Sequence, residues 1–82
     1  MKVEAFFQKN GQKAERVSVD EAKVKEGDTF PDPLIVAIAK AKEYQGVYKI
    51  NLDAYHYIPH LNDKFAEHCW DCENGVFSVI IR

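Results

Sequence analysis

Five side chains that commonly bind transition metals fall within 17 residues: His56, His60, His68, Cys69 and Cys72. A structural zinc ion takes four such groups in a tetrahedron, and a C-x-x-C pair can supply two thiolates from one turn. One function that follows is a zinc-stabilised module with ligands from His60, His68, Cys69 and Cys72. This is the alternative hypothesis, because the sequence holds no second C-x-x-C pair.

The same cysteines also fit a structure without a metal. We expect residues 63–72 to form a short helix, on which Cys69 and Cys72 share an apolar face with Leu61 and Phe65. Thiols in that position are small buried hydrophobic groups. A dithiol at the end of a helix is also disfavoured as a redox centre, because the helix dipole there opposes a thiolate. We therefore expect no metal and no cofactor.

Catalytic patterns are weak in this sequence. Ser18 and Ser78 fall in a turn and a strand rather than in a nucleophile elbow, and the four glycines form no phosphate-binding loop. Histidine and cysteine residues that lie this close in sequence more often pack together than act as a dyad. We therefore favour a non-enzymatic protein.

Aromatic and acidic residues gather in the second half of the chain. Tyr55 and Tyr57 alternate with residues that we assign to the core, and Trp70 lies opposite the apolar stripe of the expected helix. Tyrosine and tryptophan dominate the energetics of protein interfaces, and carboxylates beside them favour a basic partner. The predicted binding residues are Tyr55, Tyr57, Asp63, Glu67 and Trp70. The competing interpretation is that these rings only cover the second face of the sheet.

The primary functional hypothesis is a small protein-binding module, for example an inhibitor or regulator, that engages a basic surface of a partner protein. With 11 basic and 13 acidic residues among 82, the chain lacks the positive field of a general nucleic-acid binder. The sequence has neither a signal-peptide pattern nor a membrane-span pattern, so we expect a cytoplasmic protein. A homodimer through Phe6 or the tyrosine face is compatible with this hypothesis.

The main helix is predicted over residues 32–46. Asp32 is a suitable N-cap, Pro33 suits the first helical position, and Gly46 is placed to end the helix. At helical spacing an apolar face forms, with Lys40 and Glu43 on the opposite, polar face and Val36 among the polar positions. The apolar face contains Leu34, Ile35, Ala37, Ile38, Ala41 and Tyr44.

Alternation predicts a hairpin before this helix and two strands after it. In the hairpin, a bulge at Gly11 would gather Val3, Ala5, Phe7, Val17 and Val19 on one face. Residues 19–25 fit either a short helix or a strand end and loop.

The first strand after the main helix covers residues 47–58, is bent near Asp53 and ends at Pro59, with Tyr55 and Tyr57 turned from the core and Ala54 and Ile58 toward it. The last strand, residues 76–82, is apolar on both faces and belongs in the middle of the sheet. The expected fold is a single α+β domain over residues 1–82. It has a mostly antiparallel four-stranded sheet in ββαβ(α)β order, with one main helix across one face.

Overall fold

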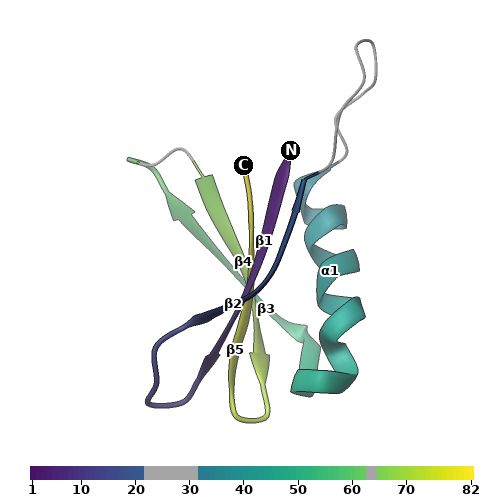
Figure 1. The fold of residues 1–82 in the computed structure, drawn as a ribbon, viewed down its shortest axis with the longest axis vertical. Coiled ribbons are helices and arrows are strands. Elements are labelled where there is room, and N and C mark those ends of the chain that lie inside the picture. Colours follow the sequence, from purple (N-terminus) through teal and green to yellow (C-terminus); the bar gives the residue numbers. More distant parts are fainter. Residues whose placement is uncertain (22–31, 63–64) are drawn as a thin grey trace.

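The computed structural model describes residues 1–21, 32–62 and 65–82, which form five antiparallel strands and one helix (Figure 1). The helix, α1, packs across one face of the sheet, whose strand order is β2-β1-β5-β4-β3. The predicted α+β class is confirmed, but the predicted number of four strands is wrong. In chain order the elements are β1 (Lys2–Lys9), β2 (Glu15–Glu21), α1 (Pro33–Tyr48), β3 (Ile50–His60), β4 (Phe65–Cys72) and β5 (Gly75–Ile81).

The fifth strand is β4, which occupies the segment predicted to be a short helix. It pairs on one side with β3 and on the other with β5. His68 and Trp70 point to the face covered by α1, here called the helix face, whereas Glu67 and Cys69 point to the opposite, open face. Residues 63 and 64, including Asp63, lie outside the described residues.

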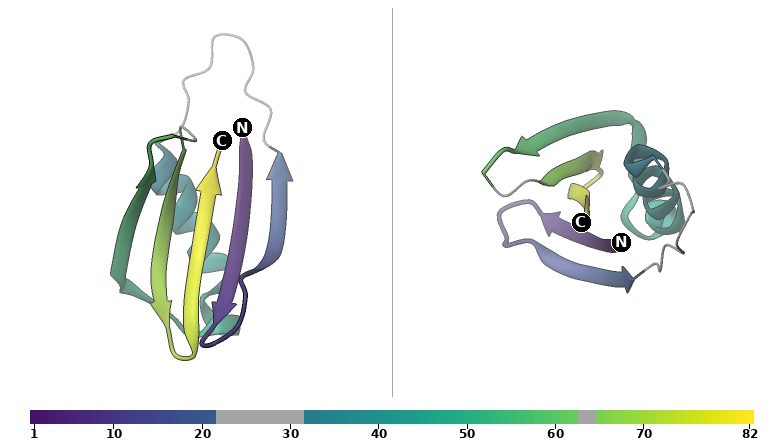
Figure 2. Two further views of the ribbon diagram at one scale, coloured as in Figure 1. Left: turned by 90° about the vertical axis from the view of Figure 1, so that its left-hand side faces the viewer. Right: turned by 90° about the horizontal axis from the view of Figure 1, so that it is seen from above.

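The last strand, β5, lies in the middle of the sheet, as its apolar sequence predicts. Phe77 and Val79 are fully buried on the helix face, where they pack with Val3 and Ala5 of β1. Figure 2 shows β5 between β1 and β4, with α1 behind the sheet. Within the described residues, no helix is long and apolar enough to cross a membrane.

The start of α1 is confirmed and its predicted end is wrong. A side-chain oxygen of Asp32 accepts a hydrogen bond from the backbone N–H of Leu34 at 2.9 Å, and Pro33 opens the helix. The helix continues past Gly46 to Tyr48, because Lys49 takes the left-handed conformation (φ 56°) that was assigned to the glycine. Residues 22–25, for which a short helix or a strand end and loop was predicted, lie outside the described residues.

The central alanines of α1 lie on the buried side of the helix, as predicted. Ala37 and Ala41 are fully buried. The buried face of the helix is nevertheless rotated relative to the predicted one, because Val36 packs against the core and Ile35 is exposed.

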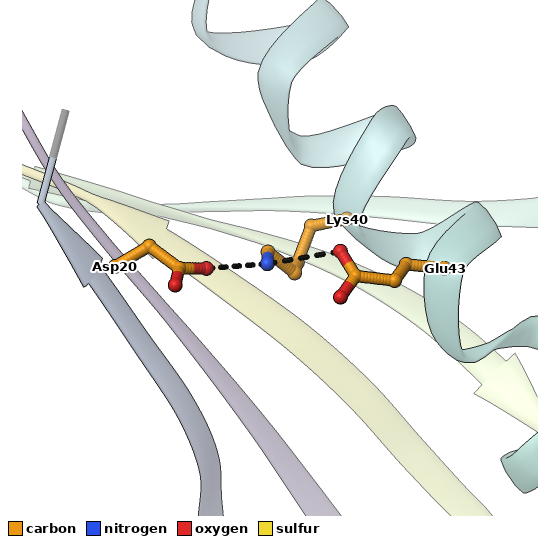
Figure 3. Close-up of polar contacts among 3 residues, drawn as sticks. All are labelled: Asp20, Lys40 and Glu43. Carbon is orange, nitrogen blue, oxygen red and sulfur yellow. Dashed lines mark hydrogen bonds and ion pairs between the residues drawn. The ribbon is translucent and has the colours of Figure 1, made fainter.

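Lys40 belongs to this rotated face rather than to a solvated face. Its side chain is only 12% exposed, and its Nζ donates to Asp20 of β2 and to Glu43 of α1, the latter at 3.0 Å (Figure 3). Burial would lower the pKa of Lys40, but the hydrogen bonds and charges of the two carboxylates outweigh burial and raise it. The contact ties β2 to α1.

The β1–β2 hairpin has its register shift between Ala5 and Phe6, and Gly11 adopts a positive φ of 77°. Val17 packs against the core as predicted. Val19 is opposite Glu4, which places it on the open face with 41% exposure, so its predicted core position is wrong. Strand β2 extends to Glu21, so residues 19–21 are strand rather than helix.

An irregularity in β3 decides which of its residues face the helix. Ile50 is opposite Cys72 and Tyr55 is opposite Trp70, so five steps along β3 span only two along β4. The surplus of three residues is odd, and it therefore reverses the alternation beyond it. Tyr55 and Tyr57 consequently lie on the helix face, and Ile58 lies on the open face. The irregularity falls where a bend near Asp53 was predicted, whereas the predicted faces of Tyr55, Tyr57 and Ile58 are wrong.

Candidate functional site: an aromatic groove beside the start of α1

An open groove of about 640 Å³ lies on the helix face where the sheet extends beyond α1. In Figure 1, β3 and β4 diverge from α1 toward the far end of their hairpin. The walls of the groove come from the first residues of α1, from the second half of β3 and from β4. The lining residues are Asp32, Pro33, Leu34, Tyr55, Tyr57, Pro59, His60, Leu61, Phe65, Ala66, His68 and Ile81.

Beneath the groove lies a buried imidazole that is held by a tyrosine. His68 is buried, and its Nδ1 lies 2.7 Å from the Tyr55 hydroxyl. Burial lowers the pKa of His68 despite the opposing charge of Asp32, so the ring is neutral at pH 7 and can accept the hydroxyl proton. Burial likewise raises the pKa of Tyr55, with smaller contributions from Tyr57 and Cys69. This pair fixes the orientation of the Tyr55 ring.

The accessible surface of the groove is apolar and aromatic. Tyr57 is 58% exposed and its ring contacts that of His68, with ring centroids 5.6 Å apart. Leu61 at the rim is 87% exposed. His60 and Phe65 are at strand positions that point to the open face, yet both reach the groove at its rim, where their rings stack with centroids 4.7 Å apart. Exposed rings and aliphatic groups around a concave surface are typical of binding sites.

Asp32 gives this apolar surface its charge. It is exposed, and it is the single carboxylate among the described residues that line the groove. One of its oxygens is used to cap α1. Its negative charge remains available to a cation in the groove. From the sequence, Asp32 was assigned only as a helix cap, and the proximity of the start of α1 to the end of β3 is what makes it part of the site.

The predicted aromatic and acidic patch does not assemble as one surface. Tyr55 and Tyr57 line the groove, but Trp70 is fully buried against Tyr55 and the core, so its predicted exposure is wrong. Glu67 points to the open face, where it contacts His60 at 3.0 Å and accepts a weak hydrogen bond from Cys69. It therefore belongs to a different surface from the tyrosines.

Two further acidic groups of the open face, Asp71 and Glu4, are also paired. Asp71 contacts His56 at 3.2 Å. Glu4 is buried and lies 3.6 to 3.7 Å from three cationic side chains, those of Lys2, Arg16 and Arg82.

The four zinc ligands of the alternative hypothesis are divided between the two faces of the sheet. His68 and Cys72 belong to the helix face, and His60 and Cys69 belong to the open face. One tetrahedral ion cannot reach all four, so the predicted ligand set is wrong. Nor do any three His, Cys, Asp or Glu side chains in residues 1–21, 32–62 and 65–82 gather as a metal site requires.

Neither cysteine has the environment of a reactive thiol. Burial, together with Glu67, raises the pKa of the Cys69 thiol to about 12. Burial also raises the pKa of Cys72. Nucleophilic and redox cysteines need the opposite shift. The prediction that these thiols are packed side chains is confirmed for Cys69, which is buried, and Cys72 is partly buried.

Comparison of the chain with protein-family models, with curated proteins and with solved structures finds no match.

Proposed function

We propose that the protein is a small binding module whose aromatic groove takes an extended segment of a partner protein that carries a basic side chain. The observation that carries the proposal is the combination of exposed Tyr57 and Leu61 with the carboxylate of Asp32 in one groove. Aromatic side chains supply large contact areas with few rotatable bonds, which suits them to protein recognition.

The charge of the groove supports a basic rather than an acidic ligand. A lysine or arginine side chain could contact the Asp32 carboxylate and lie over the face of Tyr57, which attracts cations through its ring quadrupole. The apolar neighbours of that side chain in the partner would pack against Leu61, which is 87% exposed. The groove is open to solvent, so it suits a segment of protein chain better than an enclosed small molecule.

Peptide titration tests this proposal directly. The probe is a short peptide with one arginine between leucines, and its control has glutamate in place of arginine. Calorimetric titration should show tighter binding of the arginine peptide, with the preference weakening as salt rises. Equal binding of the two peptides would refute the assigned charge preference.

Two variants separate the contributions of the ring and the carboxylate. Tyr57→Ala should weaken binding by about 10-fold or more, as truncation of an interface aromatic commonly does. Asp32→Asn should lower the preference for arginine and leave α1 intact, because asparagine is an equally good N-cap. The matched control is Val47→Ala, which trims an exposed residue at the opposite end of α1 and should leave binding unchanged.

A further inference from the structure

The two edges of the sheet are protected to very different degrees. The edge strands are β2 and β3. An edge strand offers unpaired backbone N–H and C=O groups to another chain, and proteins usually protect it with charged side chains or proline. Strand β2 is protected in this way, since four of its seven residues are charged: Glu15, Arg16, Asp20 and Glu21.

Strand β3 lacks this protection over its second half. The seven residues from Ala54 to His60 include no carboxylate, lysine or arginine, and Pro59 is the one residue among them that blunts an edge. Tyr57 is 58% exposed and Ile58 is 43% exposed, one on each face of the sheet. A neutral, exposed, partly apolar edge is the form that invites strand pairing.

We infer that a second copy of this chain pairs with this edge, β3 against β3 in antiparallel orientation around a two-fold axis at Tyr57. Tyr57 is the middle residue of the neutral run, so the run pairs entirely with itself. Tyr55 then lies opposite Pro59 of the second copy, and His56 lies opposite Ile58 of the second copy. The result is one continuous ten-stranded sheet with the isologous contact that two-fold symmetry requires.

Charge favours a second copy as the occupant. In this register no carboxylate faces another carboxylate, because Asp53, the first acidic residue before the run, lies opposite Leu61 of the second copy. The equivalent pairing of β2 with β2 would bring its charged residues into the new interface. The dimer also places Tyr57 beside its counterpart on the helix face and Ile58 beside His56 of the second copy on the open face, and the two aromatic grooves become neighbours across the axis. This inference does not depend on the proposed function.

Two matched positions, one on each edge strand, allow the pairing to be tested by substitution. They lie at the two ends of one row of residues on the open face. The pairings place Val19, Glu4, Ile80, Glu67 and Ile58 side by side on the five strands. Val19 and Ile58 are both β-branched, and their exposed fractions are 41% and 43%. Ile58→Lys places a charge at the β3 edge, and Val19→Lys places the same charge at the β2 edge.

Sedimentation equilibrium over a range of chain concentrations is the test. The unaltered chain should approach twice its 9.4 kDa mass, Ile58→Lys should raise the dimer dissociation constant about 10-fold or more, and Val19→Lys should change it less than about 2-fold. Circular dichroism verifies that both variants are folded. A chain that stays monomeric throughout, or equal effects of the two variants, would overturn the inference.

Hydrogen exchange of the unaltered chain provides a second readout that needs no variant. Backbone amides of residues 54–58 should exchange more slowly as the chain concentration rises, whereas those of β2 should not change. Concentration-dependent protection of β2 alone would assign the contact to the other edge and overturn the pairing proposed here.

Discussion

The Tyr55 hydroxyl lies 2.7 Å from Nδ1 of His68, so a residue of the edge strand supplies the hydrogen bond that a buried imidazole on the next strand requires. Tyr55 thus has two roles. Its ring lines the groove, and its hydroxyl hydrogen-bonds His68, which lies beneath the groove. The same hydrogen bond therefore contributes both to the stability of the fold and to the shape of the groove.

Removal of that hydroxyl should destabilise the fold. Tyr55→Phe leaves a buried ring nitrogen of His68 without its partner, which we expect to lower the free energy of unfolding by about 1–3 kcal/mol. Chemical denaturation measures the change. Tyr57→Phe removes a hydroxyl from an exposed ring and should stay within about 0.5 kcal/mol of the unaltered chain. Equal stability of Tyr55→Phe and Tyr57→Phe would show that the contact contributes nothing.

Stability should fall in mild acid because of His68. Burial holds its pKa in the folded state below the ordinary 6.5. As the pH falls below about 6.5, the unfolded chain therefore binds a proton that the folded chain does not, and unfolding becomes more favourable. Denaturation midpoints between pH 7.5 and 5 should decline less steeply for His68→Gln than for the unaltered chain. Parallel profiles would exclude a depressed pKa at this histidine.

Trp70 and Tyr57 should respond oppositely to truncation. Trp70→Ala removes a fully buried ring from the core and should cost about 3–5 kcal/mol. Tyr57→Ala removes an exposed ring and should cost less than about 1 kcal/mol, when measured at low chain concentration so that pairing between copies does not contribute. A comparable loss in the two variants would contradict the burial difference on which the site assignment depends.

Alanine should have opposite effects at two glycines. Gly46 lies inside α1 with open space around it, so Gly46→Ala should raise stability by about 0.5–1 kcal/mol. Gly75 lies where β5 meets β1, and an added Cβ would overlap the backbone carbonyl of Gln8. Gly75→Ala should therefore lower stability by about 1–3 kcal/mol, as overpacking does. Thermal melting of the two variants checks both signs, and a stabilised Gly75→Ala would show that β1 shifts freely.

The features that were predicted correctly are those encoded locally. The start of α1 follows from Asp32 and Pro33, which act within one turn, and the central place of β5 follows from a run that is apolar on both faces. The errors arose where contacts with residues distant in the sequence determine the local structure. Residues 65–72 fit a short helix by spacing, but the backbone groups of β5 and β3 on either side make the segment a strand.

The candidate site was found only in part, for the same reason. Tyr57 was predicted to be exposed and it is, but on the helix face, because an irregularity of odd length in β3 reverses the alternation. No local sequence pattern indicates how many residues such an irregularity contains. Asp32 joined the groove through tertiary proximity, which its role as a cap does not indicate.

The neighbours at the centre of the sheet, β1 and β5, come from opposite ends of the described chain, and Lys2 and Arg82 exchange two backbone hydrogen bonds of 2.8 and 2.9 Å. Their pairing closes a loop of nearly the whole sequence, which is the costliest contact in entropy and the slowest kind to form. During synthesis on a ribosome, the hairpins can form early, but the core must wait for residues 75–81 to emerge. A stop codon shortly before β5 would therefore remove the middle of the sheet rather than trim its margin.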